Sequence, residues 1–157
     1  MELSISMHSV GVIHGDMQPR HVGVKEDCTL KILDLDSAHA VGETYTPCDV
    51  VHYYGPPEAM IIMIQYNENI VMWPVGCIFA EMVRGEILLC GRDYNIIDHW
   101  NRITKVLGMP PADFSTQLSP EARAYTESQP EWSWMEIFPD NAFPNNTPED
   151  KIKTQHA

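Results

Sequence analysis

The feature that most constrains the fold is an apolar segment over residues 69–84, which reads NIVMWPVGCIFAEMVR. Apolar side chains fall on almost every face of the helix that this segment would form, and Gly85 stands where such a helix would end. A proline beyond the first turn of a helix costs about 3 kcal/mol, so Pro74 places the first residue near 71. The segment therefore predicts a helix over about 71–84 at the centre of a hydrophobic core.

Two further helices are predicted in the second half of the chain. Apolar side chains recur at helical spacing over residues 97–107, and the Gly-Met-Pro that follows ends the pattern. A helix over about 118–127 is indicated by Ser119 as its N-cap residue and Pro120 at its first position. Beyond residue 129 the sequence is rich in Pro and Asn and shows no periodicity.

A β-hairpin is predicted nearer the N-terminus. Short β-prone runs at 22–24 and 29–33 are separated by the polar sequence KEDC, and the second run leads into Asp34. The stretch 36–54 is polar and irregular, and after the two prolines that follow it Glu58 could begin a helix. We therefore expect a mainly α fold with a small β-hairpin, which belongs to the α+β class.

Composition excludes several classes of protein. The chain has 157 residues and a net charge of −12, and its ten Lys and Arg residues are scattered singly, whereas binding to nucleic-acid phosphates needs clustered cations. No apolar run reaches the roughly 18 residues of a membrane helix, and no basic region precedes the apolar residues of the N-terminus. The four cysteines form no C-x-x-C pair, so neither a zinc cage nor a disulfide framework is expected. We expect a cytoplasmic or nuclear protein.

Four motifs occur along the chain in a recognisable order: VIHGDMQPRHVGV, TLKILDLD, TPCDVVHYYGPPE and VMWPVGCIFAEMVRGEILLCGRDY. Together they resemble the lower, mostly helical lobe of a eukaryotic protein kinase. CTLKILD, the Thr-Pro-x tripeptide with the VVHYY that follows, GRDY and IFPD are similar to mitogen-activated protein kinases, and closest to the c-Jun N-terminal kinase group. The resemblance implies one partial kinase domain over 1–157, with a catalytic loop at 12–21, an activation segment at 34–58, the central helix at about 71–84 and a kinase-insert-like region at about 92–148.

The same resemblance leaves the upper kinase lobe without a counterpart. The sequence holds no Gly-rich phosphate loop and no strand Lys in a V-A-I-K setting. We therefore expect a truncated, degenerate lower lobe that binds neither ATP nor magnesium, although the family uses both. Because flanking helices would be missing, we also expect the isolated chain to expose apolar surface and to aggregate or need a partner.

The resemblance assigns roles to residues of the catalytic loop. In the family motif H-R-D-L-K-P-x-N, the proton-accepting Asp corresponds to Asp16, and the Lys that faces the transferred phosphate corresponds to the uncharged Gln18. The metal-binding Asn corresponds to His21, whose imidazole prefers softer metals than Mg²⁺. The metal-binding Asp of the D-F-G motif corresponds to Asp34. From the residues alone, these acids are ordinary loop carboxylates.

Regulatory and supporting positions also depart from the family pattern. Gly15 replaces the Arg that would meet an activating phosphate, while Thr46 remains as one phosphate acceptor in a Thr-Pro-Cys tripeptide. Asp36 replaces the Gly of the D-F-G motif. Val71 replaces an Asp that would accept hydrogen bonds from catalytic-loop amides, and leaving such donors unpaired costs about 1–3 kcal/mol.

The leading functional hypothesis is a kinase-like protein without phosphotransferase activity, a pseudokinase. One alternative is a fragment of a functional ATP-dependent serine/threonine kinase of the c-Jun N-terminal kinase group, whose upstream residues supply the upper lobe. A second is a decoy or binding module for protein partners of mitogen-activated protein kinases, and a third is a decayed gene copy without selected function. The aromatic residues that suggest a binding patch are Trp100, Trp132, Trp134 and Phe138.

Overall fold

The computed structural model describes residues 7, 9–42, 53–62, 68–90, 96–128 and 132–139. Its strands are β1 (Val12–Ile13), β2 (Val22–Val24), β3 (Leu30–Ile32) and β4 (His39–Ala40). Its helices are η1 (Pro19–His21), η2 (Glu58–Ile62), η3 (Glu68–Val71), α2 (Met72–Arg84), α3 (Ile96–Leu107), α4 (Ala112–Ser115), α5 (Pro120–Ser128) and α6 (Trp134–Ile137). The predicted mainly α fold with a small β-hairpin is confirmed.

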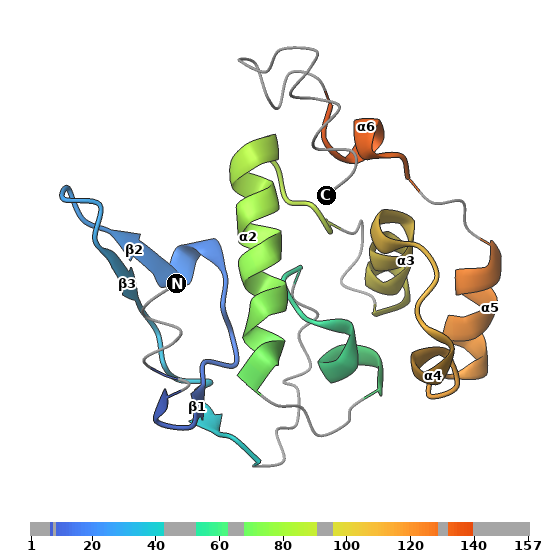
Figure 1. Ribbon diagram of the computed structural model, residues 1–157, viewed down its shortest axis with the longest axis horizontal. Coiled ribbons are helices and arrows are strands. Elements are labelled where there is room, and N and C mark those ends of the chain that lie inside the picture. Colours follow the sequence, from blue (N-terminus) through green and yellow to red (C-terminus); the bar gives the residue numbers. More distant parts are fainter. Residues whose placement is uncertain are drawn as a thin grey trace.

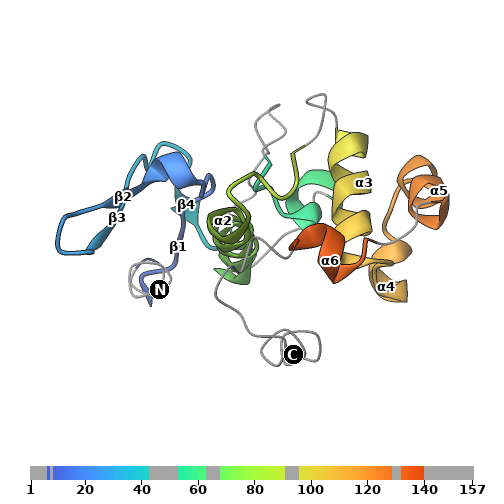
Figure 2. The same cartoon turned by 90° about the horizontal axis from the view of Figure 1, so that it is seen from above.

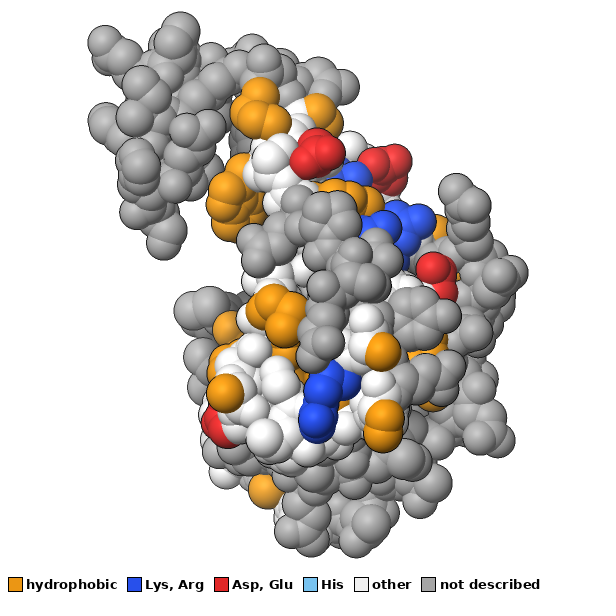
Figure 3. Space-filling view, turned by 90° about the vertical axis from the view of Figure 1, so that its right-hand side faces the viewer, with side chains coloured by type: hydrophobic (Ala, Val, Ile, Leu, Met, Phe, Trp, Pro, Cys, Tyr) orange, Lys and Arg blue, Asp and Glu red, His pale blue; other side chains and the backbone are white. Residues whose placement is uncertain are grey.

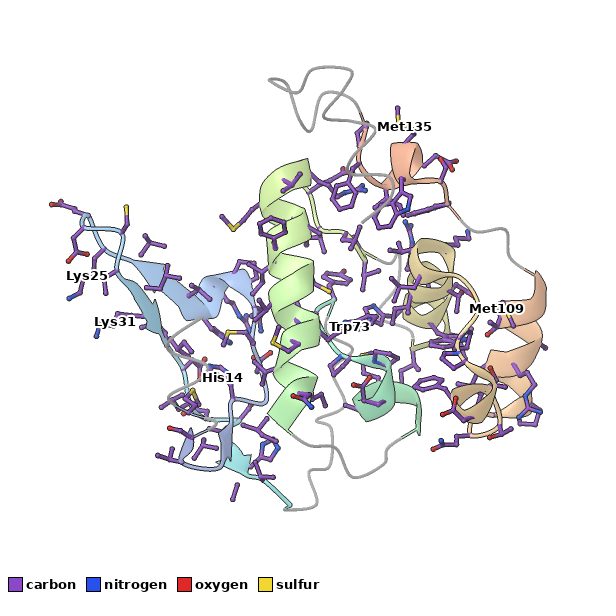
Figure 4. The ribbon with its side chains drawn as sticks, viewed as in Figure 1. His14, Lys25, Lys31, Trp73, Met109 and Met135 are labelled. Atoms are coloured by element: carbon purple, nitrogen blue, oxygen red, sulfur yellow. The ribbon has the colours of Figure 1, made fainter. Side chains whose placement is uncertain are left out.

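Helix α2 stands in the middle of the molecule. Figure 1 shows the β-strands on one side of it and α3, α4 and α5 on the other, and the view from above in Figure 2 shows the same division. In Figure 4, His14 lies on the strand side of α2, whereas Met109 lies beyond α3. The candidate catalytic loop is therefore on the strand side of the central helix.

The predicted hairpin is formed by β2 and β3, which pair antiparallel. Val22 lies opposite Ile32 and Val24 lies opposite Leu30, so the register is fixed over three residue pairs. At the turn, the Lys25 amide donates to the Thr29 carbonyl at 3.0 Å. The predicted strands end within two residues of the observed ones.

A second two-stranded sheet joins β1 to β4, and the sequence did not predict it. Val12 lies opposite Ala40 and Ile13 opposite His39, again antiparallel. Strands of two residues are too short to show an alternating pattern, which is why the stretch after Asp36 read as irregular. The sheet holds together the two ends of a segment that contains the catalytic loop, the hairpin and Asp34.

Helix α2 begins one residue after the predicted start and ends where Gly85 adopts φ +78, with its amide donating to the Glu81 carbonyl at 2.7 Å. The prediction that this helix is buried on nearly every face was wrong. One face carries Cys77 and Ala80, which are buried, but Phe79 and Met82 are 67% and 77% exposed. We call the exposed row the α2 stripe; its members are Met72, Val75, Phe79 and Met82.

The principal core lies on the other side of α2. It unites residues from four separate parts of the chain: Tyr54, Cys77, Leu89, Trp100, Ile103, Leu118 and Ala122. Trp100 is 1% exposed, and its indole N–H donates to Thr126 Oγ1 at 2.8 Å. The prediction that Trp100 belongs to an exposed aromatic patch was therefore wrong, because it anchors α3 against α5.

Helix α5 begins as predicted, with the Ser119 hydroxyl accepting a hydrogen bond from the Ala122 amide at 3.1 Å. Helices α4 and α6 were not predicted. For α6 the signal was present in the sequence, since Ser133 and Glu136 form a capping box in which each side chain accepts from the other residue's amide. A four-residue helix gives no periodicity, so this cap was its only marker.

The face drawn in Figure 3 shows no continuous basic stripe. On the face drawn in Figure 3, Lys and Arg occur in small groups between apolar and acidic side chains. Within the described residues, no helix has the length and apolar character needed to cross a bilayer.

Candidate functional site

Two backbone segments meet at the candidate site: the candidate catalytic loop between β1 and η1, and the turn that follows β3. The His14 ring Nε2 lies 3.1 Å from the Leu33 carbonyl oxygen, and the Leu33 amide donates to the His21 carbonyl at 2.9 Å. The residue after Leu33 is Asp34, which adopts φ +60, a region that non-glycine residues rarely occupy. The two contacts of Leu33 thus place Asp34 beside the catalytic loop.

His21 is the centre of the cluster, with a side chain that is only 6% exposed. Its Nδ1 lies 2.7 Å from the Asp16 carbonyl oxygen, an acceptor, so Nδ1 carries the hydrogen. Its Nε2 lies 3.0 Å from Arg20 Nε, which donates, and 3.3 Å from Asp34 Oδ2. Both ring nitrogens are therefore engaged by protein groups.

Asp16, which the resemblance assigns to the proton-acceptor position, is also held by neighbouring side chains. Gln18 Nε2 donates to Asp16 Oδ1 at 2.7 Å, while Asp16 Oδ2 lies 3.7 Å from Arg20 Nη2 and 3.5 Å from His21 Nδ1. The structure thus brings together Asp16, Gln18, His21 and Asp34, the four candidate residues that it describes. Thr46 lies outside the described residues.

The structure explains why a glycine occupies position 15. It adopts φ +80, and a Cβ at this position would overlap the Ser37 carbonyl oxygen. The turn containing Asp36 consequently lies directly against the catalytic loop. The sequence shows only that Gly15 replaces the family's Arg, because a contact between residues so far apart leaves no local pattern.

The support beneath the loop differs from the family pattern in a specific way. Val71 is 4% exposed and packs in an apolar cluster with Ile13, Ala59 and Ile70. A cavity of about 70 Å³ lies between this cluster and Asp16. The Asp16 amide donates to His14 Nδ1 at 3.3 Å, so an imidazole rather than a carboxylate supports this part of the loop.

These residues do not fit the magnesium ion that the family uses. Mg²⁺ prefers oxygen ligands in an octahedral arrangement, whereas His21 offers nitrogen and its Nε2 lone pair already accepts from Arg20. No group of three or more His, Cys, Asp and Glu side chains that could hold a metal occurs in the part of the chain that the structure describes.

Two groups with strongly shifted pKa values lie on the other side of α2, in the principal core. Burial raises the pKa of the Cys77 thiol to about 12. Burial also raises the pKa of Tyr54, and the hydrogen bond from its hydroxyl to Glu81 Oε2, at 2.5 Å, adds to the effect. Both groups are held in their protonated forms, which suits a structural role.

Comparison with known proteins identifies the family. Residues 5–132 match the model of the protein kinase domain. The chain is 54% identical over 156 residues to "Stress-activated protein kinase JNK" of Suberites domuncula, covering 96% of this chain and 42% of that relative. It is 45% identical over 145 residues to the protein of the same name from Drosophila melanogaster, covering 89% of this chain and 38% of that relative.

The chain belongs to the protein kinase family. Its likeness to the two stress-activated kinases confirms the predicted resemblance to mitogen-activated protein kinases of the c-Jun N-terminal kinase group. The chain spans about two fifths of the length of these curated relatives.

Proposed function

We propose that this chain is a protein kinase-like protein without phosphotransferase activity, a pseudokinase of the mitogen-activated protein kinase type. The observation that carries the proposal is the hydrogen bond that Arg20 Nε donates to His21 Nε2. His21 stands at the position where the family motif has its metal-binding Asn. Asp16 and Asp34 keep the proton-acceptor and metal-ligand positions. Gln18 and His21 stand where the family has the Lys that faces the transferred phosphate and the Asn that binds magnesium.

The chemical argument rests on charge. Phosphoryl transfer is catalysed almost entirely by positioning and by cations that stabilise the charge on the phosphoryl oxygens. Gln18 brings no charge, and its amide is already used in a hydrogen bond to the Asp16 carboxylate. His21, at the position of the expected magnesium ligand, offers a nitrogen atom, and this atom already accepts a hydrogen bond from Arg20. The charge of the family's Lys and that of the magnesium ion held by its Asn are thus not supplied at these two positions.

The direct test is an assay of phosphate transfer from labelled ATP, with Mg²⁺, to a peptide that contains Ser-Pro and Thr-Pro sites. Asp16→Asn removes the proton acceptor with almost no change in side-chain volume and is the matched control. We expect equal signals from the two chains. Transfer by the native chain above that of Asp16→Asn would contradict the proposal.

A second candidate is a segment of a functional serine/threonine kinase that uses ATP and magnesium. The identity of 54% to a stress-activated kinase and the presence of both Asp16 and Asp34 favour it. Sequencing the transcript upstream of the Met1 codon tests this candidate. A Gly-rich loop and a strand Lys in frame would support it, whereas a stop codon directly upstream would exclude it.

A third candidate is a module that binds protein partners of mitogen-activated protein kinases in the cytoplasm or nucleus. The α2 stripe favours it, because it presents four apolar side chains to solvent on one helix face. The test is competition with an intact c-Jun N-terminal kinase for its protein partners. Displacement of a partner by this chain would support the candidate, and no displacement would count against it.

A further inference from the structure

The position of Arg20 has no assigned role in the kinase motif, yet its side chain reaches the centre of the cluster. Arg20 Nε donates to His21 Nε2 at 3.0 Å, and Nη2 of the same guanidinium lies 3.7 Å from Asp16 Oδ2. The guanidinium is thus the positive group that contacts both the imidazole and the proton-acceptor carboxylate. Sequence reasoning missed it because the position is variable in the motif.

The geometry around His21 shows why a positive group is needed there. With the hydrogen on Nδ1 donated to the Asp16 carbonyl, Nε2 carries a lone pair. That lone pair lies 3.3 Å from Asp34 Oδ2, which is also an acceptor. Two acceptors at this separation repel each other unless a shared donor or a cation lies beside them. The Arg20 N–H donates to Nε2 and brings the positive charge of the guanidinium to this side of the imidazole ring.

We propose that Arg20, acting through His21, replaces the metal ion as the cation of this site, so that the native chain binds neither Mg²⁺ nor Mn²⁺ between His21 and Asp34. This inference rests on the proposed absence of phosphotransferase activity and explains how two retained carboxylates are held without a metal. A divalent ion would have to displace Arg20 from Nε2 and would then meet its positive charge nearby.

The surface position of Arg20 makes the inference testable. Its side chain is 67% exposed, compared with 6% for His21, so it can be replaced without disturbing the core. Removing it frees the Nε2 lone pair beside Asp34 Oδ2. A nitrogen and an oxygen ligand then face one coordination position, and Mn²⁺ accepts this combination more readily than Mg²⁺.

The experiment is an NMR titration of the full 157-residue chain with Mn²⁺, whose unpaired electrons broaden the signals of nuclei near the bound ion. The variants are Arg20→Ala and, as the control with the same charge change, Lys25→Ala at the far end of the hairpin (Figure 4). Amide spectra of each chain report whether the fold is retained. If Arg20→Ala is not folded, Arg20→Gln keeps the length of the side chain and replaces it.

We expect no selective broadening at His21 and Asp34 in the native chain or in Lys25→Ala at millimolar Mn²⁺. In Arg20→Ala we expect selective broadening at these two residues. Its affinity for Mn²⁺ should be at least about tenfold higher than that of Lys25→Ala, because a neighbouring positive charge has been removed. Selective broadening in the native chain, or equal behaviour of Arg20→Ala and Lys25→Ala, would overturn the inference. A native chain that binds Mn²⁺ but transfers no phosphate would overturn this inference alone, because the proposed lack of activity would still hold.

Discussion

Gly15 lies so close to Ser37 that a side chain at position 15 would overlap the Ser37 carbonyl oxygen. Gly15→Ala must therefore shift the turn that carries Asp36 away from the catalytic loop, in addition to the strain of a side chain at φ +80. We expect a loss of about 2–3 kcal/mol in the free energy of unfolding, measured by urea denaturation. Restoring the family's Arg at this position should destabilise the chain as well.

Gly11 provides the matched control for that experiment. It adopts φ +73, but a Cβ there would meet no atom within 4 Å. Gly11→Ala therefore carries the strain of positive φ without the overlap, and should cost about 1 kcal/mol. Equal losses in Gly11→Ala and Gly15→Ala would show that the contact with Ser37 is not tight.

The hydrogen bond between Trp100 and Thr126 should contribute measurably to the packing of α3 on α5. Thr126→Val keeps the volume of the side chain but removes the nearer of two acceptors of the buried indole N–H, and the Ala122 carbonyl oxygen at 3.2 Å remains. The variant should therefore lower the free energy of unfolding by about 1 kcal/mol. The exposed Thr116→Val should change it by less than about 0.5 kcal/mol. A double-mutant cycle with Trp100→Phe isolates the pair, and a coupling energy near zero would contradict the prediction.

The buried thiol of Cys77 predicts a loss of stability in alkali. Its pKa is raised from 9.0 to about 12, so above about pH 9 the unfolded chain releases this proton while the folded chain keeps it. The free energy of unfolding should be unaffected by this group below about pH 9, and then fall by up to about 1.4 kcal/mol per pH unit.

Urea denaturation between about pH 8 and 10 measures this effect in a range below that in which Tyr54 contributes. Cys77→Ala removes the group and should show a smaller decrease across the same range. If native chain and variant lose stability in parallel, burial does not hold the Cys77 proton in the folded state.

The N-cap of α5 predicts a smaller effect of known sign. Ser119→Ala removes the acceptor of the Ala122 amide and should lower the free energy of unfolding by about 1 kcal/mol. Ser119→Asp keeps an acceptor at the cap and should restore most of the loss. Thermal unfolding followed by circular dichroism measures both variants, and an Asp variant as unstable as the Ala variant would count against this cap.

The α2 stripe predicts self-association of the isolated chain. Phe79→Gln combined with Met82→Gln should shift sedimentation toward the monomer, while the free energy of unfolding changes by less than about 1 kcal/mol because both side chains are exposed. Met109→Gln changes an exposed apolar residue on the far side of α3 (Figure 4) and is the control. Unchanged association in the double variant would show that another surface is responsible.

The long elements could be predicted from the sequence because their signals are local. The periodicity over 97–107 and the Gly85 stop marked α3 and α2 to within a residue, and the polar KEDC between two β-prone runs marked the hairpin. The motif order identified the family and singled out four residues that the structure brings together. These features depend on neighbours in the chain, and a single sequence displays them directly.

The features that could not be predicted depend on contacts between distant residues. The pairing of β1 with β4, the overlap that Gly15 avoids and the contact of Arg20 with His21 arise only when the chain is folded. The exposure of Phe79 and the burial of Trp100 were misjudged for the same reason. Both residues are large and apolar, and only the elements packed around them decide which one meets water.

The short sheet between β1 and β4 has a consequence for how the molecule opens. Val12 pairs with Ala40 and Ile13 with His39, so the residues between β1 and β4 form a loop whose two ends are joined by this sheet. Since the entropy cost of closing a loop grows only slowly with its length, closing this long segment costs little more than closing a short one. Release of β4 would open the base of this segment, while the contacts of Leu33 with His14 and His21 would still hold Asp34 beside the loop.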